Sequence, residues 1–157
     1  MKLKAIVVSA GVWAWLAPLA AQAVRTVPLD SAAMAYSPSR NQLYVAVAER
    51  AAQYPRSVTA VNPLSGAIGA SLPLEAEAWT LAVTTDERYL YAGMVGGLIT
   101  RIDLRTFTRD LTISTAPTGL QDRIIVEIHP FPDRPTSFVA SVVGWDGLDP
   151  GAAVLAV

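Results

Sequence analysis

The sequence predicts an all-β protein made of antiparallel, four-stranded β-propeller blades. Segments of the chain repeat, with Leu43, Leu90 and Phe138 at equivalent positions 47 and 48 residues apart. Each repeat contains short apolar stretches separated by turn residues, and no segment after residue 24 keeps a helical period for long. Four short strands per unit at this spacing are typical of propeller blades.

The first half of the repeat carries the clearest similarity. Tyr36–Val45 aligns without a gap to Val83–Ala92, and a third copy with a small insertion runs from Ile128 to Ala140. By this alignment, His129 occupies the turn position held by Ser37 and Thr84. A position that accepts Ser, Thr and His is typical of a turn, so the only histidine is not expected to be catalytic.

The second half of the repeat is also recognisable. Val58–Asn62 matches Ile99–Asp103, and Ala153–Val157 begins the same strand a third time. Val27–Leu29 resembles the closing strand of a unit that has no other strands before it. We therefore expect this segment to be a strand as well.

The second unit shows the expected strands most clearly. They are Trp79–Thr84, Tyr89–Met94, Leu98–Asp103 and Arg109–Ile113. Gly96 and Gly97 can both take positive φ, as a tight hairpin between apolar strands needs. Asn62 and Asp103 are placed to begin Asx turns after the third strands.

The second and third strands carry a family resemblance. Leu43-Tyr44-Val45-Ala46, Leu90-Tyr91-Ala92-Gly93 and the aliphatic strand ends at Asn62 and Asp103 resemble the YVTN-type β-propeller repeats of secreted bacterial proteins. The resemblance covers essentially the whole chain after the first segment. It implies a propeller of about seven blades, used as a binding platform and, in some relatives, as a lactonase or a redox subunit.

The length predicts fewer blades than that. Blade 1 is expected over about 30–74, blade 2 over 78–113 and an incomplete blade 3 over 124–157. Since four to eight blades close a ring, we expect the partial propeller of residues 24–157 to be a fragment whose main partners are downstream blades of the same protein. Its unpaired apolar edges should promote association.

The first 23 residues have the three parts of a secretory signal. Lys2 and Lys4 precede an apolar run from Ala5 to Ala17, and Ala21-Gln22-Ala23 provides a cleavage pattern. The alternative is a transmembrane anchor, which needs about 20 apolar residues. We expect cleavage after Ala23, a secreted or periplasmic protein, and no membrane association afterwards.

Composition excludes several kinds of site. The formal net charge is -1, which gives no electrostatic footprint for nucleic acid. The chain has no cysteine, which excludes disulfides, thiolate metal sites and a cysteine nucleophile. Asp146 and Asp149 could contribute to a calcium site, but Asp-Gly and Asp-Pro are ordinary turn dipeptides, so no metal or other cofactor is expected.

The connections differ in how much their lengths vary. The second-to-third and fourth-to-first strand connections vary most, and in an up-and-down blade these connections emerge on one face, where insertions often mark binding. The candidate binding residues on this face are Arg50, Tyr54, Arg56, Trp79, Asp122, Arg123, Trp145 and Asp146. For Trp79 and Trp145, packing between blades is the alternative.

Two classes of function fit these features. The favoured one is an extracytoplasmic binding or scaffolding module for a protein or glycan ligand. The alternative is the N-terminal part of a secreted propeller enzyme, such as a lactone hydrolase. An enzyme should place several carboxylates or histidines on the first strands near the ring axis, where this sequence offers only Glu127, so binding is favoured.

Overall fold

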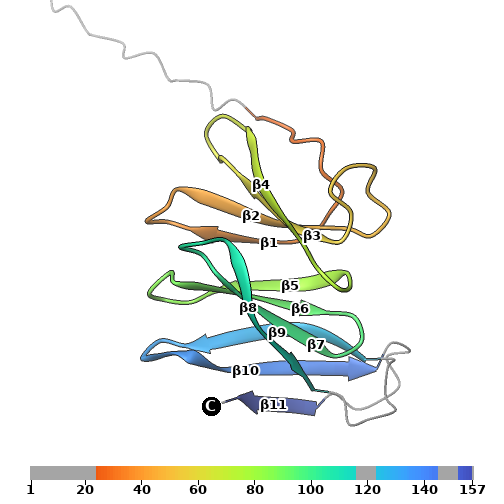
Figure 1. The fold of residues 1–157 in the computed structure, drawn as a ribbon, viewed down its shortest axis with the longest axis vertical. Coiled ribbons are helices and arrows are strands. Elements are labelled where there is room, and N and C mark those ends of the chain that lie inside the picture. Colours follow the sequence, from red (N-terminus) through yellow and green to blue (C-terminus); the bar gives the residue numbers. More distant parts are fainter. Residues whose placement is uncertain (1–23, 116–122, 145–151, 157) are drawn as a thin grey trace, which may run out of the picture.

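The fold is an all-β stack of three sheets, seen in a computed structural model that describes residues 24–115, 123–144 and 152–156 (Figure 1). Blade 1 contains β1 (Ser31–Ser37), β2 (Gln42–Val47), β3 (Ser57–Val61) and β4 (Ile68–Pro73). Blade 2 contains β5 (Ala78–Val83), β6 (Tyr89–Met94), β7 (Leu98–Asp103) and β8 (Thr108–Ser114). Blade 3 contains β9 (Arg123–Phe131), β10 (Arg134–Gly144) and β11 (Ala152–Ala156).

Within each blade, strands that are consecutive in sequence pair antiparallel, as an up-and-down blade requires. The first strands β1, β5 and β9 lie next to one another across the stack (Figure 1). Across these ranges no helix occurs, and none could therefore span a membrane. The prediction of antiparallel propeller blades is confirmed.

The strand register confirms the repeat alignment of the second and third strands. Leu43 pairs with Val61, Leu90 with Ile102, and Phe138 with Ala156. The segment Ala153–Val157 was therefore aligned correctly from sequence.

The main core lies between the blades rather than within any one of them. Between blades 1 and 2, Tyr44 and Ala46 share a buried cluster with Leu90 and Met94. Between blades 2 and 3, Tyr91 packs against Phe138 with ring centroids 4.8 Å apart. Adjacent blades thus bury their facing apolar sides against one another, as expected of a repeat protein.

The predicted turns are present. Gly96 and Gly97 have φ of 82° and 68°. The Asn62 side chain accepts a hydrogen bond from the backbone N–H of Ser65 at 2.9 Å, and that of Asp103 accepts one from Arg105 at 2.7 Å. Backbone hydrogen bonding to the Asp103 carboxylate holds the pKa of that group below its usual value.

The N-terminal segment differs from the prediction. Residues 24–30 form no strand, so the strand expected at Val27–Leu29 is wrong. Val27 and Leu29 instead pack against Val45 and Val61 on the outer face of blade 1. Their apolar side chains fit the core, but none of the strands in the described ranges pairs with their backbone.

Blade 3 departs from the prediction at the β9–β10 hairpin. His129 lies within β9 and pairs with Val139, so its assignment to a turn is wrong. Phe138 pairs with Pro130, whereas Leu43 pairs with Tyr36, so the register makes His129 equivalent to Ala35 rather than Ser37. The sequence insertion lengthens both strands instead of enlarging the turn.

Candidate ligand-binding site

Two sets of connections emerge on opposite faces of the stack. The β2–β3, β4–β5 and β6–β7 connections lie on one face, on the right in Figure 1, which we call the loop face. The β1–β2, β5–β6 and β9–β10 turns lie on the other, which we call the turn face. The loop face is the one from which the candidate binding residues were drawn.

A β-bulge recurs in the first strand of every blade. The register shifts between Ser31 and Ala33 in β1, between Ala78 and Thr80 in β5, and opposite Ser141 and Val142 in β9. The extra residues are Ala32, Trp79 and Val126, which are spaced 47 residues apart (79 − 32 = 47; 126 − 79 = 47).

The bulge turns its residue out of the sheet. Trp79 is 44% exposed and Val126 is 37% exposed, although both lie in the innermost strands. Bulges are used next to binding sites because they redirect a side chain. Trp79 is therefore displayed on the surface rather than buried between blades, which favours the binding interpretation over the packing alternative.

A pocket of about 490 Å³ lies where blades 1 and 2 meet on the loop face. It is lined by Ser31, Ala32, Ala48, Glu49, Arg50, Glu77 and Trp79. Two bulge residues form part of its wall, and the β2–β3 and β4–β5 connections supply its charged side chains. Of the candidates named from sequence, Arg50 and Trp79 meet in this pocket.

One ion pair joins the β2–β3 connection to the start of β1, and a second lies within the connection itself. The Arg50 Nε lies 3.2 Å from an Asp30 carboxylate oxygen, which joins the connection to the start of β1. The Arg56 guanidinium lies 3.8 Å from Glu49. Both pairs are largely exposed, so they orient side chains more than they stabilise the fold.

The same connection holds an uncommon backbone conformation. Tyr54 and Arg56 have φ of 54° and 49°, the left-handed region that few residues other than glycine adopt. The Arg56 carbonyl accepts a hydrogen bond from the N–H of Leu74 at 2.8 Å, and the Tyr54 carbonyl accepts one from Ser57. Such backbone strain clusters at functional sites. Tyr54 is exposed near the pocket but is not among its lining residues.

The remaining candidates are distributed differently. Arg123 begins β9, and its carbonyl accepts hydrogen bonds from the N–H groups of Gly96 and Gly97 at 2.7 and 3.0 Å. Its backbone therefore joins blade 3 to the β6–β7 turn. Asp122, Trp145 and Asp146 lie outside the described residues.

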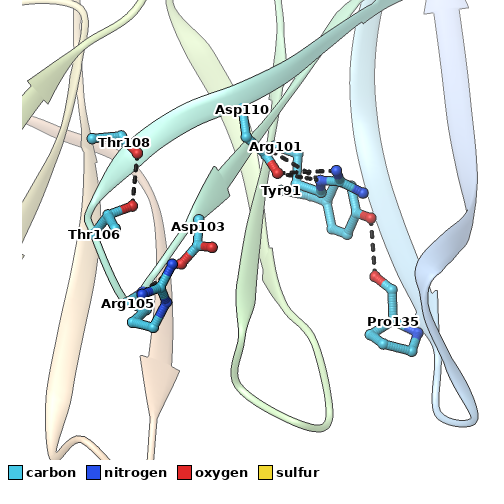
Figure 2. Close-up of polar contacts among 8 residues, drawn as sticks. All are labelled: Tyr91, Arg101, Asp103, Arg105, Thr106, Thr108, Asp110 and Pro135. Carbon is cyan, nitrogen blue, oxygen red and sulfur yellow. Dashed lines mark hydrogen bonds and ion pairs between the residues drawn. The ribbon is translucent and has the colours of Figure 1, made fainter.

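The charged residues of β7 have structural roles (Figure 2). Arg101 donates hydrogen bonds to Asp110 from both Nε and Nη2, and its guanidinium lies 4.4 Å from the Tyr89 ring centre. Beside it, buried Tyr91 donates its hydroxyl proton to the Pro135 carbonyl at 3.0 Å. Burial raises the pKa of Tyr91. Arg101 is therefore part of the blade packing rather than of a solvated strand face.

The first strands carry one acid–histidine pair. His129 Nε2 lies 3.5 Å from the Glu127 carboxylate, and both side chains are largely exposed on β9. Sequence reasoning placed only Glu127 on a first strand, because it assigned His129 to the turn that follows. In the described ranges no three His, Cys, Asp or Glu side chains gather closely enough to hold a metal ion.

Comparison with known proteins identifies the fold. No protein-family model matches the chain. No curated protein matches it in sequence either. Among solved structures, the RRP9 WD40 repeats are similar with a TM-score of 0.57 and 13% identity over 84% of this chain. The Myceliophteria thermophila Cps50 (Swd1) β-propeller domain is similar with a TM-score of 0.58 and 14% identity over 84% of this chain. Kuenenia stuttgartiensis hydrazine synthase gives a TM-score of 0.59 and 15% identity over 88% of this chain.

These similarities establish propeller blades as the architecture. The chain spans about 40% of the length of each of these solved chains. Identities of 13 to 15% carry no information on ligands.

Sequence reasoning missed the recurring bulge and the carboxylates of Glu49 and Glu77 that line the pocket. Ala32, Trp79 and Val126 differ too much in size and chemistry to look like one repeat position. Their common 47-residue spacing was the available signal, but only the strand register shows that each is an extra residue.

Proposed function

We propose that this chain is an extracytoplasmic binding or scaffolding module of the YVTN repeat type, and that its ligand docks in the loop-face pocket between blades 1 and 2. The observation that carries the proposal is the pocket itself. A bulge places the half-exposed Trp79 ring beside Arg50, Glu49 and Glu77, in a hollow of about 490 Å³.

The pocket has the composition of a recognition site. An aromatic ring gives a large contact area at low conformational cost, and charged groups around it give orientation. Export rests on the signal-like first 23 residues, and a protein or glycan is the expected class of ligand.

A secreted propeller enzyme remains the second candidate, because Glu127 and His129 lie 3.5 Å apart on an inner strand. Such a pair could act in general acid–base catalysis. Loss of lactone hydrolysis in a Glu127→Gln variant that keeps its fold would favour this alternative.

The proposal is tested by screening the purified full chain on glycan and peptide arrays. Replacing Trp79 by alanine should weaken binding of any hit by about tenfold or more, because exposed aromatics at the centre of a site dominate binding energy. The matched control is Leu64→Ala, which removes an exposed apolar side chain from the β3–β4 turn on the turn face. Equal loss in both variants, or none in either, would place the ligand elsewhere.

A further inference from the structure

Two carboxylates occupy the same repeat position in blades 1 and 2. Asp30 and Glu77 are 47 residues apart (77 − 30 = 47). The Asp30 carbonyl accepts a hydrogen bond from the N–H of Ala48 at 2.8 Å, and the Glu77 carbonyl accepts one from Val95 at 3.0 Å. Ala48 and Val95 are again 47 residues apart (95 − 48 = 47), so the two acids are structurally equivalent.

Only one of these carboxylates has a cation beside it. In blade 1, the Arg50 guanidinium lies 3.2 Å from Asp30. The same repeat position in blade 2 is Gly97 (50 + 47 = 97), in the tight turn between β6 and β7. In the part of the chain that the structure describes, no ion pair or side-chain hydrogen bond reaches the Glu77 carboxylate.

The unmatched acid lies in the pocket, beside the aromatic ring. Glu77 is half-buried and lines the same hollow as Trp79 and Glu49. The pocket and its ion pairs contain the carboxylates of Asp30, Glu49 and Glu77 and the guanidinium groups of Arg50 and Arg56, and the two guanidinium groups pair with Asp30 and Glu49. The local excess of one negative charge is the charge of Glu77.

We propose that this pocket binds a cationic group of its ligand, an alkylammonium or guanidinium, between the Glu77 carboxylate and the Trp79 ring. The ligand then supplies to Glu77 the charge that Arg50 supplies to Asp30. A cation over an aromatic face beside a carboxylate gains from both partners, most of all where water is partly excluded. This inference rests on the proposed function, since it names the ligand chemistry of the same pocket.

The test uses four small probes with one common apolar body. Butylammonium and butylguanidinium carry the cation, while 1-butanol and pentanoate are the neutral and anionic controls. Each is titrated into the purified full chain labelled with ¹⁵N at tryptophan, and the indole N–H resonance of Trp79 is followed. The resonance is assigned by its loss in a Trp79→Phe variant.

Both cations should shift the Trp79 resonance in a saturable manner, and the controls should not. The Glu77→Gln variant keeps the shape of the side chain. It should lower the affinity for both cations by about three- to tenfold. Glu75→Gln is the matched control, because it removes a carboxylate from the same β4–β5 connection but outside the pocket, where Glu75 pairs with Arg109. It should leave cation binding unchanged.

Three results would overturn the inference. If 1-butanol or pentanoate shifts the resonance as strongly as the cations, or if Glu75→Gln weakens cation binding as much as Glu77→Gln does, the pocket recognises another chemistry and the proposed function stands. If Trp79→Ala weakens an array hit while neither cation shifts the resonance, the inference alone is wrong. If no probe shifts the resonance and Trp79→Ala leaves every array hit unchanged, the proposed function fails with it.

Discussion

Replacing Gly93 by alanine should force blades 2 and 3 apart. A Cβ atom at Gly93 would lie 2.5 Å from the Ile125 Cγ2 and 2.6 Å from the Thr80 Cγ2. Carbon atoms in contact prefer about 3.5 to 4.0 Å, so the neighbours would have to move by about 1 Å. Ile125 is fully buried and cannot move into solvent.

The expected cost is about 1 to 3 kcal/mol of unfolding free energy, the usual range for an extra methyl group in a packed core. The neighbouring interface explains why glycine is needed here. Ala46 holds the position of Gly93 in blade 1, and Ala78 holds that of Ile125 in blade 2 (46 + 47 = 93; 78 + 47 = 125). A small residue thus faces a small one in the first interface, while glycine accommodates isoleucine in the second.

Urea unfolding of the single and double variants measures this effect. Ile125→Ala alone should cost about 2 to 5 kcal/mol through the cavity it leaves. In that background the added methyl group of Gly93→Ala has room, so the two changes should couple favourably by about 1 to 2 kcal/mol. A Gly93→Ala variant as stable as the parent, or strictly additive changes, would refute the packing argument.

Three further predictions concern other parts of the molecule. Glu87 accepts hydrogen bonds from the side chain of Ser37 and from the backbone and side chain of Ser39, which join the turn faces of blades 1 and 2 and lower the Glu87 pKa. Because the pKa of Glu87 is lowered in the folded state, its hydrogen bonds stabilise the fold above the ordinary pKa of 4.5, and this stabilisation is lost as the pH falls below it. In a Glu87→Gln variant, the urea midpoint should therefore depend less on pH between pH 3 and 6. Arg101→Lys should destabilise the chain by about 1 kcal/mol and lower its melting temperature, because lysine keeps the charge but not the paired hydrogen bonds to Asp110. The control is Arg109→Lys at the exposed pair with Glu75, which should change the melting temperature little. Export should remove residues 1–23, so mass spectrometry of exported protein should find Val24 or a near neighbour at the N-terminus. An intact Met1 in the membrane fraction would show that the segment is an anchor instead.

Local chemistry made the strands predictable from sequence. The turns at Gly96-Gly97, Asn62 and Asp103 depend on residues within the turn itself, so the sequence specifies them directly. The third strand of blade 3 was aligned correctly because its apolar pattern repeats an earlier one. His129 was misplaced because an insertion can enlarge a turn or lengthen a hairpin, and only strand pairing distinguishes the two.

The amino-acid sequence by itself determined the repeat, the four-stranded unit and the face from which variable connections emerge. The tertiary structure alone decided which side chains meet there. The bulge that exposes Trp79 is a property of two paired strands, and the unmatched charge of Glu77 is visible only when its blade is compared with the one beside it. Both depend on contacts between distant residues, because hydrogen-bond register and charge pairing are set across strands and blades rather than along the chain.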